Sequence, residues 1–515
     1  MRDILIATSL ANLFFLRAWE RALFGLYADD FKPESTTVAM LVLILAVVFR
    51  VGWQIARSSA RLAFFARISF LLLLLVPVNA LRLYYQLTFR SWHANRYYWV
   101  VYAILAIVAM FMLFAVLTGR LKMRALVRCG IVLTLALTPF SLFTFGLAIR
   151  ATYHRLSNEA QQKASLGAST PFPSSEWASP EPKRARVVWI IFDELDERAA
   201  FTNRSPSVSL PELDRFRSES FVAMAAYPPG GSTMQSIPAL LNGREVTGVT
   251  ARDDLLSIWQ KDQPGPVIWS APMTIFQEAH AAGLKTGLVG ALLPYCATHG
   301  SVISDCRDFH TRKSWPTKVS STMLTTLEAV PLAFRLFLRD RTFDRRMQRY
   351  EFLIHDGSEM ASNPKLDLVY LHFPFPHPPG VYDRALGRLD TSKRHSYLDN
   401  LVLTDVSFGA LRRAMEQTGI WHESAVIVSS DHWWRTDGWK NHSDWTEEEE
   451  REVAGLAPDH RVPFIVKLAG NTEPMIYQKN LNTIVTYKMV MALLKGQIGA
   501  SKDLALWLDS QAATQ

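Results

Sequence analysis

The chain has 515 residues, a formal net charge of +8 at pH 7 and a hydrophobic fraction of 49%. A chain of this length is expected to form two domains rather than one compact core. The positive charge does not indicate a nucleic-acid-binding protein, because no basic run interleaved with aromatic side chains forms a binding stripe. The apolar residues are concentrated in residues 1–150, and the remainder has the composition of a soluble protein.

Residues 1–150 contain five apolar runs, and each approaches the ~20 residues that a membrane-spanning helix needs. Arginine-rich segments follow the second and fourth runs, which by the positive-inside rule places them and the N-terminus in the cytoplasm. The sequence therefore predicts a multi-pass protein of a bacterial inner (plasma) membrane, with about five spans and a C-terminal domain in the periplasm or outside the cell. The runs are residues 4–27, 38–55, 68–87, 98–117 and 126–149.

Residues 151–185 are rich in Ala, Ser, Pro and Gln, a composition typical of a linker. From residue 186 onward, strand-like apolar runs alternate with helical segments. This alternation predicts an α/β domain over residues 186–500, with a largely parallel central sheet covered by helices. Residues 501–515 are expected to form a polar tail. Ligands of such sheets bind beyond the C-terminal ends of the strands, where the candidate reactive residues fall.

A helix N-terminus is predicted at Ser232 and Thr233. Gly230 and Gly231 permit a sharp turn before it, and a short apolar segment follows it. Backbone N–H groups and the helix dipole favour a phosphate or sulfate at such a position. The Thr233 hydroxyl could attack phosphorus there if its proton is removed. The alternative is an ordinary loop.

Two polar pairs directly follow predicted strands. Asp193 and Glu194 follow the first, and two adjacent carboxylates repel each other unless a cation neutralises them. Asp431 and His432 follow a later strand and form a mixed oxygen and nitrogen pair that suits zinc or manganese. Calcium or magnesium remains open, since both bind carboxylate oxygens. The alternatives are a solvated acidic turn and a hydrogen-bonded turn.

Two further segments carry candidate substrate-binding residues. His372 and His377 lie in a proline-rich segment that holds them stiffly. Lys440 and His442 lie close together and could bind a phosphoryl oxygen or a second metal; an ordinary polar loop is the alternative.

Cys296 and Cys306 are close in sequence and do not form a Cys-x-x-Cys pair, so a zinc site is not expected. In an oxidising compartment they would close a small disulfide loop.

These motifs occur in an order that resembles the alkaline phosphatase/sulfatase superfamily over about residues 186–495. Sulfatases use a Cys or Ser that is converted to formylglycine, whereas this chain has Thr233 at the corresponding position. The pattern Thr233-x-x-Ser236-x-Pro238 resembles the phosphoethanolamine transferases instead. The predicted arrangement of five spans before an outer catalytic domain is similar to those transferases and to lipoteichoic acid synthases.

The resemblance implies the roles of Glu194, Thr233, Asp431, His432, His377 and His442, and the motifs themselves add Asp193, His372 and Lys440. Thr233 would be the nucleophile, and it would share the main metal with four other residues. Four more would contact the transferred phosphoryl group or a second metal. The metal set is Asp193, Glu194, Thr233, Asp431 and His432; the substrate set is His372, His377, Lys440 and His442.

The resulting hypothesis is a membrane-anchored, metal-dependent phosphotransferase. It would move a phosphoethanolamine or phosphoglycerol headgroup from a membrane phospholipid, through a phospho-threonine, to a glycan or glycolipid of the cell envelope. One alternative is an outer-face hydrolase of sulfate or phosphate esters. The other is a catalytically degenerate, membrane-tethered sensor or assembly protein.

Overall fold

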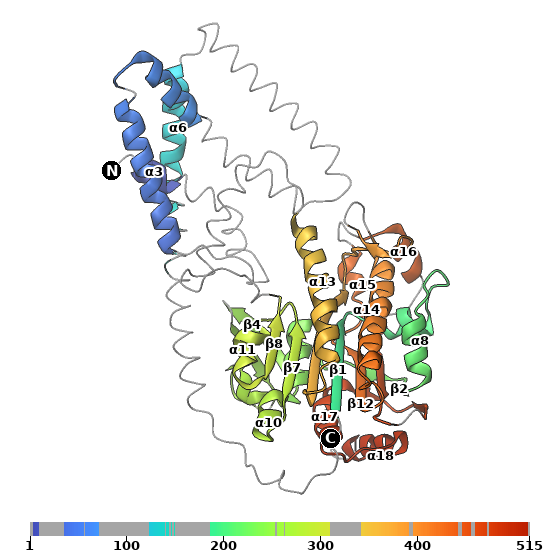
Figure 1. Cartoon of the computed structure of the whole chain (residues 1–515). Helices are drawn as coiled ribbons and strands as arrows, with labels where there is room; N and C mark the ends of the chain where they lie inside the picture. The colour runs from blue at the N-terminus through green and yellow to red at the C-terminus, as the bar shows by residue number, and fades with distance from the viewer. Residues whose placement is uncertain are drawn as a thin grey trace. The chain divides into compact units, whose positions relative to one another are not determined.

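The computed structural model describes residues 4–9, 35–55, 57–71, 123–139, 141–143, 146, 149, 186–252, 255–261, 263–309, 341–390, 395–440, 445–454, 459–470 and 473–512. The chain divides into two compact units. One contains the described residues up to 149, and the other contains those from 186 onward (Figure 1). The predicted linker, residues 151–185, lies outside the described residues.

The first unit contains the helices α3 (Ser35–Ile55) and α6 (Met123–Ala136). No helix among the described residues is long and apolar enough to cross a membrane. The 14 residues of α6 fall short of the ~20 that a crossing needs. The predicted membrane domain of five spans is therefore wrong, as is the multi-pass localisation that was based on it. Most of the predicted runs at residues 4–27 and 68–87, and the whole run at 98–117, lie outside the described residues.

The second unit is built around an eight-stranded mixed sheet with the order β14-β2-β13-β12-β1-β9-β7-β8. Its strands are parallel to their neighbours except at β13, which runs antiparallel to both β12 and β2. The predicted α/β domain is thus present, with a mixed sheet. The strands are β1 (Arg186–Asp193), β2 (Phe221–Ala223), β7 (Thr286–Gly290), β8 (Asp305–Asp308), β9 (Leu368–Pro376), β12 (Ser424–Ser430), β13 (Phe464–Lys467) and β14 (Met475–Tyr477).

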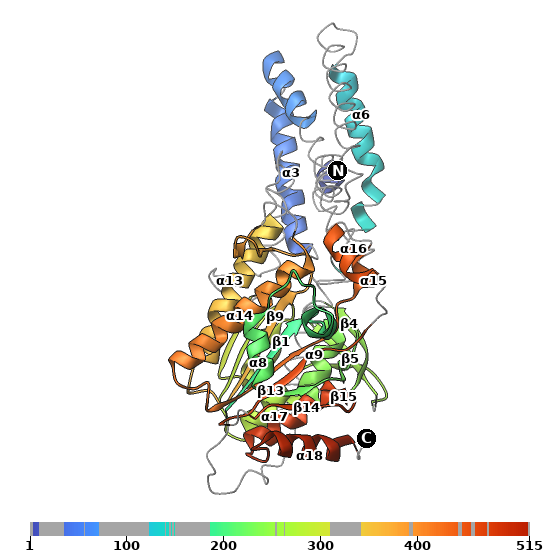
Figure 2. The same ribbon diagram turned by 90° about the vertical axis from the view of Figure 1, so that its right-hand side faces the viewer.

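Helices cover both faces of this sheet (Figure 2). Alternate residues of β1 point to opposite faces, so that Val187, Trp189 and Ile191 join one apolar core and Val188, Ile190 and Phe192 the other. All eight residues of β1 are buried, as expected for a central strand between two helical layers. One layer holds α8 (Pro211–Ser218), α13 (Arg341–Ala361) and α14 (Tyr397–Gln417); the other holds α9 (Thr233–Asn242), α10 (Ile275–Ala281) and α17 (Thr486–Leu494).

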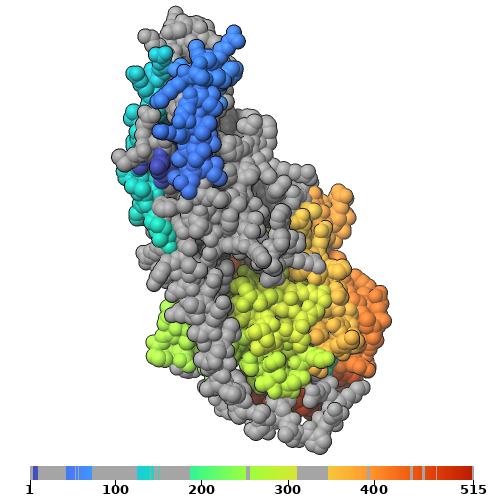
Figure 3. All heavy atoms as spheres, turned by 60° about the vertical axis from the view of Figure 1, so that its left-hand side comes forward, coloured from blue at the N-terminus to red at the C-terminus, as the bar shows by residue number. Residues whose placement is uncertain are grey.

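The remaining helices and strands complete the second unit. In the space-filling view, the yellow-green part of the chain, which includes β7 and β8, adjoins α13 in gold (Figure 3). The helical elements are α11 (Tyr295–His299), α15 (Thr436–Trp439), α16 (Glu447–Val453), α18 (Ser501–Ala512), the π-helix η2 (Arg198–Thr202) and the 3-10 helices η3 (Ala271–Met273), η4 (Gly300–Val302) and η5 (Thr483–Val485). The remaining strands are β3 (Ala226–Tyr227), β4 (Val246–Arg252), β5 (Leu255–Gln260), β6 (Val267–Ile268), β10 (Tyr382–Asp383), β11 (Arg388–Leu389) and β15 (Leu481–Asn482).

Two further expectations are settled by these elements. Cys296 and Cys306 form a disulfide, which confirms the predicted bridge. The expected polar tail instead forms α18 over Ser501–Ala512, and Leu504 and Leu508 are buried in the core. Leu504 and Leu508 are four residues apart and therefore lie on one face of a helix, a pattern that the overall polar composition of the segment does not indicate.

Candidate active site

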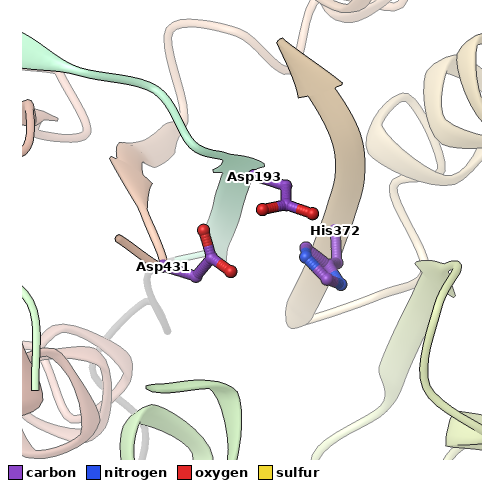
Figure 4. Close-up of side chains that lie close together, drawn as sticks. All are labelled: Asp193, His372 and Asp431. Atoms are coloured by element: carbon purple, nitrogen blue, oxygen red, sulfur yellow. The ribbon is translucent and has the colours of Figure 1, made fainter. Parts of the chain in front are cut away.

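Three buried side chains from neighbouring strands meet at one edge of the sheet. Asp193 is the last residue of β1, His372 lies in β9, and Asp431 directly follows β12. Because β9 and β12 both run parallel to β1, their C-terminal ends lie together. The three side chains point toward one another (Figure 4), and one ligand atom from each lies within 4.8 Å of the others.

Each of the three residues has a polar atom without a hydrogen-bond partner among the described residues: Asp193 Oδ2, Asp431 Oδ2 and His372 Nε2. All three side chains are fully buried. Burial raises the pKa of Asp193 well above its usual value, and the nearby charges of Asp431 and Glu194 raise it further. Burying such groups unpaired is costly, and a cation between them would remove that cost. The unpaired atoms and the mixed oxygen and nitrogen donor set thus fit a divalent metal ion.

The imidazole of His372 is held from behind by Tyr295. The Tyr295 hydroxyl lies 2.7 Å from His372 Nδ1. Burial lowers the pKa of His372 to about 4, so the ring is neutral at pH 7. A neutral imidazole with one nitrogen engaged has the other lone pair available for a metal. The structure therefore groups His372, predicted as a substrate-binding residue, with the carboxylates.

Thr233 is the first residue of α9. Ser232 before it is extended and makes no side-chain cap. The Ser236 hydroxyl donates to the Gly230 carbonyl at 2.9 Å, which fixes the turn before the helix. Thr233 Oγ1 lies 3.4 Å from Asp193 Oδ1 and 3.3 Å from His432 Nε2. The predicted nucleophile is thus placed beside the cluster of Asp193, His372 and Asp431.

A network of short contacts orients Asp431 and His432. The Asp431 carboxylate accepts from the backbone N–H groups of His432 at 2.8 Å and Glu194 at 3.2 Å. His432 Nδ1 lies 3.0 Å from the Trp433 carbonyl, an acceptor that requires a proton on Nδ1. The Nε2 lone pair then faces Thr233 Oγ1 and is 3.5 Å from Asp193 Oδ1 and from Asp431 Oδ2. Both metal binding and proton acceptance need this tautomer.

The carboxylate of Glu194 is engaged by other side chains. Glu194 has a left-handed backbone, with φ of 62°, and its Oε1 lies 2.7 Å from Arg435 Nη2. Trp439 Nε1 donates to Oε2 at 3.0 Å. His377 Nε2 is 4.0 Å from Oε1, and its ring packs edge-on against Trp439. Glu194 is therefore adjacent to the cluster but not part of it.

The structure places the remaining predicted residues less centrally. Lys440 is exposed, and His442 lies outside the described residues. The two tryptophans that directly follow His432 differ in burial. Trp434 is buried and stacks on Tyr397 with ring centroids 4.0 Å apart. Trp433 is half-buried and stacks on His460 at the same centroid distance.

Sequence reasoning missed three residues that contact the predicted ones: Tyr295, Arg435 and Trp439. Tyr295 lies 77 residues from His372, and no sequence motif connects the two. Arg435 and Trp439 follow Asp431 and His432 so closely that they could have been tested as partners of the acidic pair. Their residue types, one basic and one aromatic, are the only indication of a role that the sequence gives.

The model of the family described as Sulfatase matches residues 185–496, which is more than half of the chain. The chain belongs to the Sulfatase family. The match spans the sheet, Thr233 and the cluster of Asp193, His372 and Asp431. It bears out the suspected alkaline phosphatase/sulfatase superfamily, and this Sulfatase domain indicates an enzyme.

A search of curated proteins found no match to this Sulfatase family chain. Among solved structures, it is similar to Ps i-CgsB in complex with k-i-k-neocarrahexaose, with 12% identity, a TM-score of 0.42, and coverage of 63% of this chain and 76% of that one. A protein in the alkaline phosphatase superfamily from Vibrio parahaemolyticus is 14% identical, with a TM-score of 0.40 and coverage of 61% and 67%. The phosphonate monoester hydrolase of Agrobacterium radiobacter is 13% identical, with a TM-score of 0.38 and coverage of 61% and 74%.

Proposed function

We propose that this chain is a metal-dependent phosphoester hydrolase that acts through a covalent phospho-threonine on Thr233. The observation that carries the proposal is the position of Thr233 Oγ1. It lies at the N-terminus of a ten-residue helix, 3.3 Å from His432 Nε2 and 3.4 Å from Asp193 Oδ1. A hydroxyl next to a proton acceptor at a helix N-terminus is the arrangement of an activated nucleophile that receives an anionic ester.

Threonine favours phosphate over sulfate as the transferred group. The resemblance to sulfatases implies a formylglycine made from Cys or Ser, and threonine cannot supply that aldehyde. The nucleophile here would be an unmodified hydroxyl. Phosphorus accepts such a nucleophile by direct displacement, which leaves a phosphate ester on the enzyme.

Two displacements complete the proposed reaction. In the first, Thr233 Oγ1 forms a bond to phosphorus, its proton passes to His432 Nε2, and the bond to the ester oxygen breaks. The leaving alkoxide takes up a proton from solvent. In the second, water attacks the phosphorus and gives up a proton to solvent, and the bond to Thr233 Oγ1 breaks. Thr233 Oγ1 takes its proton back from His432 Nε2, and phosphate leaves.

The residues that would hold the metal are Asp193, Asp431 and His372, with Glu194 as a further ligand implied by the family resemblance. The resemblance also implies His432 as a ligand, but in this mechanism its one lone pair, on Nε2, accepts the Thr233 proton instead. A divalent ion bound there supplies positive charge for the phosphoryl oxygens and for the Thr233 alkoxide. The backbone N–H groups at the start of α9 add to this field.

A phosphotransferase is the second candidate function. In that case the phospho-threonine would react with an alcohol instead of water. The half-buried indole of Trp433 favours a ring-containing acceptor beside Thr233. A Cβ on Gly231, two residues before Thr233, would lie 3.1 Å from the Trp433 ring, so the indole is near the nucleophile. A phospholipid donor and a cell-envelope glycan or glycolipid acceptor are the proposed substrates of this variant.

The test is intact-mass analysis after brief exposure to 4-nitrophenyl phosphate, bis(4-nitrophenyl) phosphate and 4-nitrophenyl sulfate, with zinc or manganese present. We expect a phosphate-containing adduct on Thr233 and release of nitrophenol from a phosphate substrate. Thr233→Ala should form no adduct and lose turnover, while Thr233→Ser should keep part of the rate because the attacking oxygen remains.

The matched control is Ser232→Ala, which removes the neighbouring hydroxyl and should retain the adduct. Added glycerol separates the two candidates: glycerol phosphate among the products supports the transferase, and inorganic phosphate alone supports the hydrolase. Full activity of Thr233→Ala, or faster cleavage of the sulfate, contradicts the proposal. Absence of turnover with every ester would favour the non-catalytic alternative.

A further inference from the structure

The candidate metal ligands are themselves contacted by further buried side chains. Its centre is Tyr295, the first residue of α11, which is fully buried. The Tyr295 hydroxyl is 2.7 Å from His372 Nδ1, and the two rings meet edge to face at a centroid distance of 5.9 Å. His372 contributes a ligand atom to the cluster with Asp193 and Asp431, and its other ring nitrogen, Nε2, has no hydrogen-bond partner among the described residues.

We propose that Tyr295 is a positioning residue, which holds His372 in the tautomer and orientation needed to bind a metal with Nε2. The inference rests on the proposed function, because it assumes a metal at the cluster. In this arrangement Nδ1–H donates to the phenolic oxygen, and the Nε2 lone pair faces the two carboxylates. A ligating histidine whose other nitrogen donates to a fixed acceptor is oriented and made more basic by that contact.

The backbone around Tyr295 is built to bring the phenol to His372. A Cβ on Gly290, at the end of β7, would lie 2.7 Å from Tyr295 Cε2, so only glycine leaves room for the ring. Leu292, between Gly290 and Tyr295, has φ of 74°, a conformation that is costly for a branched side chain. Leu292 itself is exposed, whereas Ala291 and Leu293 on either side of it are buried, and the turn leads directly into α11.

The residue after Tyr295 is anchored twice. The Cys296 N–H donates to Asp308 Oδ2 at 2.8 Å, and the Cys296 side chain is bridged to Cys306. Cys306 and Asp308 both belong to β8, which pairs with β7. The start of α11 is thus tied to the same sheet that carries His372, and Tyr295 has little freedom to move away from it.

The test compares Tyr295→Phe with wild-type protein in metal-binding titrations without substrate. The probes are Zn²⁺ and Mn²⁺ added to chelator-treated full chain in competition with an indicator. Phenylalanine keeps the ring and its packing and removes only the hydroxyl. We expect metal affinity to fall by about 10–100-fold, the range seen when the partner of a ligating histidine is removed.

The matched control is Tyr477→Phe, which removes a phenol that donates to Asp509 Oδ1 at 2.9 Å, away from His372. It should bind metal as tightly as wild type. Tyr295→Phe with wild-type affinity would overturn the proposal, as would an equal loss of affinity in both variants.

A second measurement does not depend on the variant folding. Nitrogen NMR of metal-free wild-type protein should show His372 protonated at Nδ1, whereas protonation at Nε2 would overturn the proposal. The two failures are distinguishable. If wild-type protein binds neither metal, the proposed metal-dependent function fails, and the protonation state of His372 still decides the role of Tyr295.

Discussion

Asp193 and Glu194 show how two adjacent acidic residues can acquire different surroundings. Asp193 ends β1 and keeps one carboxylate oxygen without a hydrogen-bond partner among the described residues. Glu194 adopts a left-handed backbone, and Arg435 and Trp439 engage its carboxylate. A carboxylate already paired with a guanidinium offers less to a metal than one whose second oxygen has no hydrogen-bond partner. The family resemblance alone does not make this distinction.

We therefore expect Asp193→Asn to weaken Zn²⁺ or Mn²⁺ binding far more than Glu194→Gln does. Loss of the Asp193 charge removes a ligand from the cluster, whereas loss of the Glu194 charge chiefly breaks the contact with Arg435. Calorimetric titration of the metal-free proteins measures both effects. The reverse order would show that Glu194 is the principal ligand and that its contact with Arg435 gives way when metal binds.

At the scale of elements, α11 places Tyr295 next to His372 at its first residue and carries a buried histidine at its last. His299 is fully buried, and neither ring nitrogen has a hydrogen-bond partner among the described residues. Its ring meets Trp269 edge-on at a centroid distance of 4.4 Å. Burial lowers the pKa of His299 to about 3 from the usual 6.5. Burial of the His299 ring in α11 therefore favours the folded chain only while the ring is neutral.

This shift predicts how acid affects the fold. The unfolded chain binds a proton at His299 near pH 6.5 and the folded chain only near pH 3, so this contribution to stability is complete above pH 6.5 and is lost as the pH falls toward 3. His299→Leu, a change of similar volume, removes that contribution. The free energy of unfolding of His299→Leu, relative to wild type, should therefore rise by about 1.4 kcal/mol for each unit by which the pH falls within this window.

Urea unfolding of both proteins from pH 8 to pH 4 measures the difference. The value at pH 8, where both side chains are neutral, isolates the packing cost of the substitution. A difference that stays constant with pH would mean that His299 acquires a proton in the folded protein.

On the scale of the whole molecule, the C-terminal ends of the central strands impose an electrostatic cost on the fold. The central strands β1, β9 and β12 are fully buried and pack into apolar cores on both faces. Their C-terminal ends bring two carboxylates into the same buried region, and burial with mutual repulsion raises the pKa of Asp193. Apolar burial must therefore offset an electrostatic penalty that the active site imposes on the fold.

Metal binding should relieve this penalty for the entire unit. A ligand that binds only the folded state adds about 2.7 kcal/mol to the free energy of unfolding at one hundred times its dissociation constant. We expect the transition of residues 186–512 to move to higher temperature with Zn²⁺ or Mn²⁺ and back with a chelator. Metal-free Asp193→Asn should melt above metal-free wild type and gain less from metal; a variant stabilised by metal as much as wild type would contradict the assigned cluster.

The sequence by itself determined the family, the existence of an α/β domain, the disulfide between Cys296 and Cys306, and which residues to examine. These features follow from local order: a strand-like run followed by an acidic pair, or two glycines followed by a hydroxyl at a helix start. They can be read within about ten residues, where backbone geometry restricts the outcome. The same local reading was wrong for the five membrane spans and for the polar tail that forms α18. In both, composition was used in place of the length and face of a helix.

Only the tertiary structure decided which candidates meet. Asp193 and Asp431 are far apart in sequence and become neighbours because β12 pairs beside β1. His372 joins them because β9 pairs on the other side, and Tyr295 reaches it from α11. The antiparallel direction of β13 and the contact of Arg435 with Glu194 also depend on long-range pairing. Such contacts carry no periodic signal along the chain, because packing of the sheet and its two helical layers determines them.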